Sequence, residues 1–225
     1  MERKVIKTSD GSTTIYIENW NEHYHSKHGA IQEAYHVFIN SGFYPYLKNN
    51  KSEELSILEI GFGTGLNAFI TYLEAENNGV QVKYDGVEAY PVKSEEIALL
   101  NYVEELKAEE KRAIFNKMHE IDWEDYKRVS KFFQLKKRKQ FFSEITDVNL
   151  FDIVYFDAFG ARVQPELWEE VIFEKMYKAL KTNGILVTYA AKGSVRRAMQ
   201  KVGFMVEKLP GPPGKREMLR AVKNC

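Results

Sequence analysis

A short apolar strand that runs into three alternating glycines and then into a helix constrains the fold of this chain more than any other feature. The strand is "LSILEI" (55–60), the glycines are Gly61, Gly63 and Gly65, and "TGLNAFITYLEAE" (64–76) has apolar residues at helical spacing. Glycine allows the backbone to turn sharply and to approach a ligand closely. The junction therefore predicts the first strand–loop–helix unit of an open α/β sheet that binds a nucleotide-like ligand.

Strand and helix patterns keep alternating along the rest of the chain, which favours a parallel sheet with helices on both faces. "FMVEKLPG" and "KREMLRAV", joined by "GPPG", predict two closing antiparallel strands. We therefore predict an α/β, Rossmann-like, mostly parallel and doubly wound sheet over 55–225, with an antiparallel C-terminal edge. Residues 1–54 do not fit the alternation and are predicted to form an N-terminal extension or lid packed on this core. The other predicted strands are "VQVKYDGVE" (80–88), "FFQLKK" (132–137), residues 151–157 and "GILVTYA" (184–190).

Composition limits the cellular setting. The chain has 225 residues and no formal net charge, which suits a single globular unit, and no apolar run is long enough for a signal core or a membrane span. Cys225 is its one cysteine, so an intrachain disulfide and a cysteine-based zinc site are excluded. We expect a cytoplasmic protein with no membrane partner.

Charge is unevenly distributed along the chain despite the neutral total. Residues 95–110 hold six acids and one base, residues 131–139 hold five bases and no acid, and residues 192–225 hold nine bases and two acids. Such runs usually form solvated faces. Two basic segments in a neutral chain nevertheless make an anionic partner a hypothesis to test.

The residues around the glycines indicate which ligand the loop holds. A dinucleotide fingerprint needs a small residue where Leu66 stands, and the Gly-Lys-Ser/Thr sequence of a phosphate loop is absent. Glu59 places a carboxylate beside the loop, which suits a cationic amino group. Glu88 ends the next strand 23 residues beyond Gly65, close to the usual position of an acid that holds ribose hydroxyls. This combination predicts the S-adenosyl-L-methionine site of a class I methyltransferase fold.

A later strand delivers another carboxylate to the same edge of the predicted sheet. "LFDIVYFDAFGARVQPELW" (150–168) begins as a buried strand and ends that strand on Asp157, before a turn. Helix capping or turn chemistry is one explanation of this aspartate. The other is that ligands of open α/β sheets bind outside the carboxyl ends of the strands, which makes Asp157 a candidate catalytic residue.

Four segments of the chain resemble the methyltransferase domain of the bifunctional enzyme that completes 5-methylaminomethyl-2-thiouridine at the wobble position of tRNA. The chain departs from the family's usual Asp-Gly-Phe-x-Pro and Asn-Pro patterns at Ala158, Gly160 and Gln164. The resemblance spans nearly the whole chain. The segments are "NEHYHSKHGAIQEAYHVFI", "EIGFGTGLNAF", "FDAFGARVQPELW" and "AAKGSVRRAMQKVGFMVEKLPGPPGKREMLRA".

The resemblance implies an S-adenosyl-L-methionine-dependent tRNA methyltransferase acting on the aminomethyl nitrogen of the modified uridine in the anticodon loop. In the family a flavin-dependent oxidase domain follows; this chain stops at Cys225, so we expect a stand-alone form whose aminomethyl precursor comes from a separate enzyme. Asp157 is then expected to orient the amine and accept its proton. Gln140 stands where the family usually has an acid that holds the adenine amino group, and its amide oxygen can accept the same bond.

Substrate contacts are expected at the lid and in the basic C-terminal segment. "HYHSKH" (23–28) lacks a carboxylate or thiol partner for a metal and methyl transfer needs none, so we expect no metal there. Phosphates around a splayed-out wobble base are expected to meet residues 136–139 and 192–225. The expected substrate and tRNA contacts are Tyr24, His25, Phe159, Arg196, Arg197, Lys215 and Arg216.

Three other functions fit parts of the sequence. A class I methyltransferase for a small amine or acid keeps the cofactor site without RNA, although the basic C-terminal segment argues against it. An oxidoreductase acting on CH–NH groups is disfavoured by Leu66 and by the missing oxidase domain. A non-catalytic RNA-binding module is disfavoured because the glycines and the strand-end acids are all present.

Overall fold

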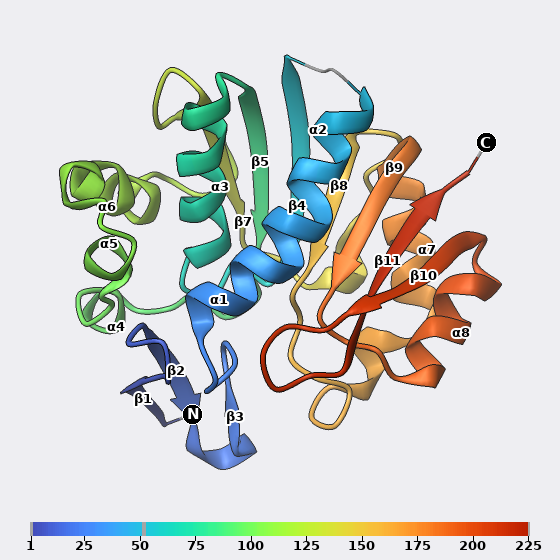
Figure 1. The fold of residues 1–225 in the computed structure, drawn as a ribbon, viewed down its shortest axis with the longest axis horizontal. Helices are drawn as coiled ribbons and strands as arrows, with labels where there is room; N and C mark the ends of the chain where they lie inside the picture. The colour runs from blue at the N-terminus through green and yellow to red at the C-terminus, as the bar shows by residue number, and fades with distance from the viewer. Residues whose placement is uncertain (1, 51–52, 225) are drawn as a thin grey trace.

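An eight-stranded sheet runs through the centre of the structure and carries helices on both faces (Figure 1). The computed structural model describes residues 2–50 and 53–224. The strand order across the sheet is β10-β11-β9-β8-β4-β5-β7-β6. In chain order the strands are β4 (Glu54–Ile60), β5 (Gln81–Val87), β6 (Lys127–Arg128), β7 (Phe133–Arg138), β8 (Phe151–Phe156), β9 (Leu180–Thr188), β10 (Phe204–Pro210) and β11 (Glu217–Lys223).

The predicted doubly wound α/β fold is confirmed. The neighbouring strands β9, β8, β4, β5 and β7 are all parallel. The predicted antiparallel closing pair is the β10–β11 hairpin, and β11 pairs antiparallel with both β9 and β10. The antiparallel strand β11 therefore lies inside the sheet, while β10, which runs in the majority direction, forms the edge.

Helices cover both faces because side chains alternate along each buried strand. On β8, Ile153 and Tyr155 belong to one core cluster, whereas Val154 and Phe156 belong to the other. The first core includes α1 (Ala30–Ala34), the π-helical segment η2 (Tyr35–Phe43), α2 (Tyr44–Asn50), α3 (Leu66–Asn78), α5 (Tyr102–Glu105) and α6 (Arg112–Glu120). The second core includes η4 (Phe142–Glu144), η5 (Pro165–Trp168), α7 (Glu170–Ala179) and α8 (Gly193–Lys201). The turns α4 (Ser94–Ile97) and η3 (Glu109–Lys111) are further helical elements of the described residues.

The N-terminal residues form a small sheet at the carboxyl end of the parallel strands (Figure 1). It contains β1 (Arg3–Lys7), β2 (Thr13–Ile17) and β3 (Glu22–His23) in that order, with the turn η1 (Glu18–Trp20) before β3. Arg3 ties β1 to the loop after β5, because its guanidinium donates to the Tyr90 carbonyl at 3.0 Å and to the Glu96 carboxylate at 3.2 Å. This sheet therefore borders the edge at which such folds bind ligands.

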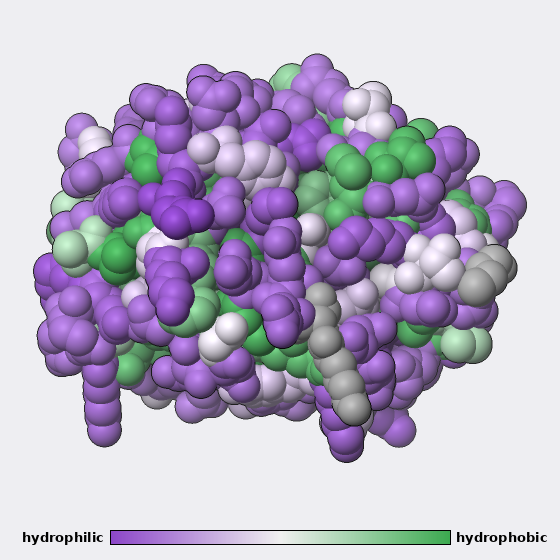
Figure 2. Space-filling view, turned by 90° about the horizontal axis from the view of Figure 1, so that it is seen from above, coloured by the Kyte–Doolittle hydropathy of each residue, from purple (hydrophilic) through white to green (hydrophobic). Residues whose placement is uncertain are grey.

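The opposite end of the molecule, where the parallel strands begin, is mostly hydrophilic (Figure 2). Apolar side chains show on that face only in small groups. Within residues 2–50 and 53–224, no helix is both long and apolar enough to cross a membrane.

Candidate cofactor and catalytic site

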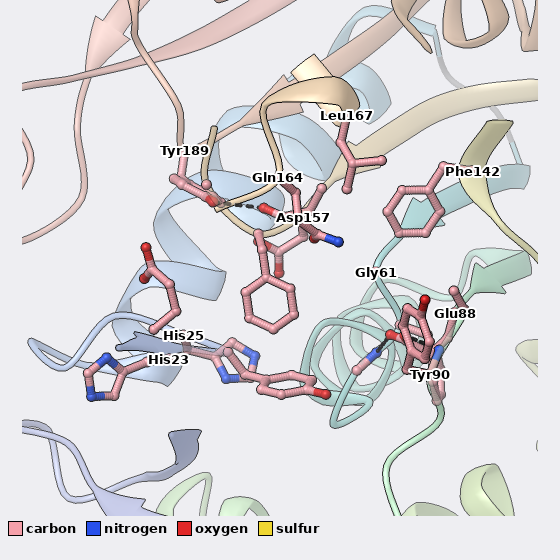
Figure 3. Close-up of a pocket in the computed structure, with 18 of the residues that line it drawn as sticks. His23, His25, Gly61, Glu88, Tyr90, Phe142, Asp157, Gln164, Leu167 and Tyr189 are labelled. Atoms are coloured by element: carbon pink, nitrogen blue, oxygen red, sulfur yellow. Dashed lines mark hydrogen bonds between the residues drawn. The ribbon is translucent and has the colours of Figure 1, made fainter. Parts of the chain in front are cut away.

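A cavity of about 670 Å³ lies between the carboxyl edge of the large sheet and the N-terminal sheet. Figure 3 shows Glu88 and Tyr90 toward one side of this cavity, Asp157 near its middle, and Tyr189 on the side away from Glu88. The loops that follow β3, β4, β5, β8 and β9 all contribute to the lining. Residues distant in the sequence therefore meet here, because β4, β5, β8 and β9 end at the same edge of the large sheet and β3 lies in the sheet that borders it.

The glycine loop after β4 adopts backbone conformations that favour glycine. Gly61, Gly63 and Gly65 have φ values of +92°, +49° and +73°. The backbone N–H groups of Gly61 and Phe62 both donate to the Val87 carbonyl at 3.0 Å, which holds the loop to the end of β5. Gly61 and Gly63 line the cavity, and Gly65 lies behind them as the N-cap of α3.

Glu88 directly follows β5 and lies beside the glycine loop, where the sequence predicts it (Figure 3). Its carboxylate accepts the backbone N–H groups of Gly63 at 3.0 Å and Tyr90 at 2.8 Å. Burial raises the pKa of Glu88, and these backbone bonds oppose the rise. Each carboxylate oxygen has further lone-pair capacity, so the group suits two adjacent ribose hydroxyls.

We expect Glu88→Ala to weaken S-adenosylmethionine binding by about 1–3 kcal/mol, because a charge-assisted acceptor is lost. The loss also frees the N–H groups of Gly63 and Tyr90, which loosens the loop. Isothermal calorimetry measures the affinity, with Glu88→Gln as the matched variant that keeps one acceptor oxygen. Wild-type affinity in the alanine variant would remove Glu88 from the cofactor site.

Asp157 directly follows β8 and lies in the cavity (Figure 3). Burial, and next the Glu33 carboxylate, raise the pKa of Asp157 to about 7, while Asn67 and Lys215 oppose this rise. Its Oδ2 atom accepts a bond from the Asn67 side chain, and not from the backbone of a helix N-terminus. The observed contact therefore differs from a helix cap, and a carboxyl group that titrates near neutral pH suits proton transfer.

Asn67, in the first turn of α3, connects two strand-end acids. Its Nδ2 group donates to Glu59 Oε1 and to Asp157 Oδ2, each at 2.9 Å. Glu59 is fully buried, and burial raises its pKa well above the usual range. The sequence predicts that Glu59 faces a cationic ligand, but the structure positions Glu59 behind Asn67 and outside the cavity lining. Asn67 was not predicted from the sequence as a site residue. The one feature that could have pointed to it is its position two residues after Gly65, the last glycine of the loop.

An ion pair between distant parts of the chain forms another part of the lining. Lys215, in the β10–β11 loop, donates to Glu33 Oε1 of α1 at 2.5 Å. The Lys215 Nζ atom also lies 3.8 Å from the centre of the Tyr189 ring. Lys215, which the sequence predicts to contact the substrate, lines the cavity, whereas Glu33 has no sequence signal beyond being an acid within an apolar helical stretch.

Aromatic rings gather beside Asp157. Phe159 packs edge-on against Tyr24 and Trp20, with ring centres 5.0 Å and 5.5 Å apart. Tyr24, His25 and Phe159 all line the cavity, in line with their predicted positions. Burial lowers the pKa of His25 to about 4, so this imidazole is neutral at pH 7 and serves as part of the wall.

Gln140 follows β7 but does not line the cavity. The neighbouring Phe141, Phe142 and Ser143 form that part of the lining instead. The Gln140 Nε2 atom is buried without a hydrogen-bond partner among the described residues. Aromatic rings rather than the predicted amide are therefore the groups that this wall offers to an adenine.

The basic segments are less available than the sequence indicates. Lys137 and Arg138 are buried in β7, where Lys137 donates to the His119 carbonyl at 2.5 Å and Arg138 to Asp147 at 2.8 Å. The expectation that residues 136–139 meet phosphates is therefore wrong for these two side chains. In the C-terminal segment, internal ion pairs engage Lys201, Lys208, Lys215 and Arg220.

The three predicted arginine contacts lie outside the cavity lining. Arg197 and Arg216 are exposed, and neither forms an ion pair with a residue in the described part of the chain. Arg196, on α8, is half-buried, and its Nε atom has no partner within the described residues. These side chains do not contribute to the cavity itself.

Acidic side chains outnumber basic ones in the lining. The acids are Glu22, Glu33, Glu88, Asp157, Glu166 and Glu169, and the bases are Arg3, Lys27 and Lys215. Ion pairs engage two of these bases, Arg3 and Lys215, and two of these acids, Glu22 and Glu33, which leaves the unpaired acids in the majority among the described residues of the lining. The cavity therefore favours a cationic ligand. Across residues 2–50 and 53–224, no group of three or more His, Cys, Asp or Glu side chains is arranged to hold a metal ion.

The cavity fits S-adenosylmethionine in its chemistry. The backbone of Gly61 and Gly63 lines the cavity, Glu88 offers paired acceptors, and the acidic lining suits a sulfonium. The fold and this site together define a class I S-adenosylmethionine-dependent methyltransferase. The family model described as S-adenosyl-L-methionine-dependent methyltransferase matches residues 106–224, and the chain belongs to this family.

Curated relatives carry a more specific name, tRNA 5-methylaminomethyl-2-thiouridine biosynthesis bifunctional protein MnmC. The protein of that name from Leptospira interrogans is 30% identical over 232 residues, which cover 94% of this chain and 34% of the relative. The one from Leptospira borgpetersenii is 28% identical over 219 residues, covering 90% of this chain and 32% of the relative. The chain thus spans about a third of the length of these relatives.

Solved structures agree on the fold. MNMC2 from Aquifex aeolicus has a TM-score of 0.75 at 24% identity, over 98% of this chain and 69% of that chain. Spermidine synthase from Thermotoga maritima has a TM-score of 0.56 at 11% identity, over 98% of this chain and 68% of that chain. Both support the class I architecture. At these identities they show the fold alone, and not the substrate.

Proposed function

We propose that this protein transfers a methyl group from S-adenosylmethionine to the aminomethyl nitrogen of 5-aminomethyl-2-thiouridine at the wobble position of tRNA. The relatives' names support the substrate class. The observation that carries the chemistry is the Asp157 carboxyl group, with a pKa of about 7, in an acid-lined cavity. An alkyl amine attacks only with an uncharged nitrogen, methylation turns that nitrogen into an ammonium, and such a carboxylate can receive the proton that the ammonium then loses.

The proposed roles follow from the positions of the side chains. Bound S-adenosylmethionine supplies an electrophilic methyl group on a positively charged sulfur. Glu88 holds the ribose hydroxyls, and the aromatic wall around Phe159 holds the uracil ring. Asp157 accepts an N–H bond from the amine, aligns the nitrogen lone pair for attack, and takes up the proton released as the new N–C bond forms.

Access to tRNA is proposed beside the cavity. A nucleoside in a single-stranded loop can be rotated out of its stack, so its base can enter a cavity at small cost. α8 and the β10–β11 loop both start at the sheet edge that borders the cavity, and their exposed Arg197 and Arg216, with Arg196, are the proposed phosphate contacts. A tRNA substrate implies a cytoplasmic site of action, and a separate enzyme is proposed to supply the aminomethyl group.

The test is methyl transfer to tRNA isolated from cells that lack this protein, followed by nucleoside analysis. We expect 5-methylaminomethyl-2-thiouridine to appear at the expense of the aminomethyl nucleoside. An Arg197→Ala, Arg216→Ala double variant should keep cofactor affinity while its tRNA affinity falls and depends less on salt, because fewer phosphates are neutralised. Cofactor binding without any methylated tRNA nucleoside would reject the proposed substrate.

A small amine is the second candidate substrate. Its support is the acidic cavity, together with the internal pairing of four bases in the C-terminal segment. Small primary amines offered in the same assay separate the two candidates. Turnover of a free amine with no methylated tRNA nucleoside would favour the small-molecule function.

A further inference from the structure

Three contacts hold Asp157 against the glycine loop. Its backbone N–H donates to the Ile60 carbonyl at 2.9 Å. Its own carbonyl oxygen lies so close to Gly61 that a Cβ there would stand 2.7 Å away. Its carboxylate accepts the Asn67 bond at 2.9 Å. The first two contacts position the backbone, whereas only Asn67 acts on the carboxylate itself.

The amide of Asn67 is held in a single orientation. Its Nδ2 group donates one hydrogen to Glu59 Oε1 and the other to Asp157 Oδ2. A flipped amide would present its oxygen to the Asp157 carboxylate, which is ionised over part of the neutral range and cannot donate in that state. Glu59 accepts the other hydrogen of the amide, so the Nδ2 group lies between the two acids. This gives the fully buried Glu59 a function that needs no contact with the ligand.

We propose that Asn67 is a positioning residue, which holds the Asp157 carboxylate in the orientation and ionised state that methyl transfer requires. This inference rests on the proposed function of Asp157 and adds a residue to it. With Oδ2 bonded to Asn67, the Oδ1 atom remains to face the amine. The hydrogen bond also stabilises the charged form of the carboxylate, against burial and the repulsion from Glu33.

The other groups around Asp157 come from different elements. Glu33 of α1 disfavours its negative charge, and Lys215 of the β10–β11 loop favours it. The charge of Asp157 in turn raises the pKa of Glu59 of β4. Tyr84 of β5 and Tyr189 after β9 also interact with its charge. Removal of the Asn67 donor leaves Lys215 as the remaining favourable neighbour among these groups. Asp157 should then stay protonated to a higher pH.

The direct experiment follows the Asp157 carboxyl carbon by ¹³C NMR through a pH titration of the whole chain, with Asp157→Asn to assign the signal. We expect Asn67→Ala to move the titration midpoint upward by about one pH unit, the usual size for a lost charge-assisted hydrogen bond. Asn67→Leu keeps the side-chain volume, removes the same donor and should give the same shift. Asn78→Ala is the control, because Asn78 also donates from α3, to the Glu74 carbonyl, but at the far end of the helix. An unchanged midpoint in both Asn67 variants would overturn the proposal.

The kinetic experiment uses single-turnover methyl transfer from pH 6 to 10. The ratio of the Asn67→Ala rate to the wild-type rate cancels the ionisation of the amine itself. We expect a loss of about fivefold at pH 7 that shrinks as the pH rises and Asp157 ionises in both proteins. A loss that is constant with pH would contradict the role of Asn67 in keeping Asp157 ionised. Since the NMR titration needs no tRNA, a wrong substrate assignment and a wrong role for Asn67 give different results.

Discussion

Asp157→Asn should reduce the rate of methyl transfer by about 10²–10⁴-fold, the range for positioned acid–base groups. The amide keeps the shape of the side chain and can still orient an N–H group, but it cannot take the proton. Single-turnover kinetics with aminomethyl-containing tRNA measure this step separately from product release. A rate within threefold of wild type would make Asp157 a structural residue.

The matched control lies on the same strand. Asp152 is buried near the start of β8 and accepts bonds from Tyr46 at 2.9 Å, from the Ser56 backbone at 2.8 Å and from Lys181 at 2.9 Å. Asp152→Asn weakens this network at the end of the strand away from the cavity. We expect it to lower the free energy of unfolding while leaving the methyl-transfer rate close to wild type. If Asp152→Asn lowers stability but keeps the methyl-transfer rate, then a slow rate in Asp157→Asn is not explained by lost stability alone.

The effect of pH on Asp157 has opposite signs for rate and for stability. The folded-state pKa of about 7 lies above the ordinary value of 3.8, so methyl transfer by wild type should fall as pH drops through 7 and the carboxylate is protonated. Stability changes the other way, because above pH 7 the native state holds a poorly solvated charge that the unfolded chain solvates freely. Asp157→Asn removes this charge and should be at least as stable as wild type at pH 8, as measured by urea unfolding.

Gly61→Ala should destabilise the protein by about 2–5 kcal/mol, which combines backbone strain with steric overlap. Gly61 has φ of +92°, and its added Cβ would stand 2.7 Å from the Asp157 carbonyl oxygen, a backbone atom that cannot rotate away. The glycine loop and the end of β8 would have to separate. We therefore also expect weaker S-adenosylmethionine binding, measured by calorimetry on the fraction that folds.

Gly79→Ala is the matched control for this substitution. Gly79 caps the C-terminus of α3 with φ of +67°, and a Cβ there would meet nothing within 4 Å. It should therefore show only the backbone strain, about 1–2 kcal/mol, with normal cofactor affinity. Equal losses of stability in the two variants would contradict the close approach of Gly61 to Asp157.

Local patterns in the sequence were enough to predict the architecture and several positions in the site. Alternating apolar strands and helices predicted the parallel sheet, because periodicity reflects which faces of an element are buried. Gly61 and Gly63 were predictable because the loop needs conformations that favour glycine. Glu88 and Asp157 were predictable as neighbours because parallel strands end at one common edge.

Contacts between residues distant in the sequence decided the partners and charge states of the side chains in the site. The 2.5 Å pair between Glu33 and Lys215 joins residues 182 apart in the chain, and no local pattern announces it. The same is true of the pKa of Asp157, which burial, Glu33, Asn67 and Lys215 set together. Lys137 looked like a phosphate contact in a basic run, yet its position inside β7 buries it. Chain order and residue type therefore determined the fold and which edge of the sheet holds the site, whereas burial and through-space distances, which exist only in the folded chain, determined the charge state and partners of its side chains.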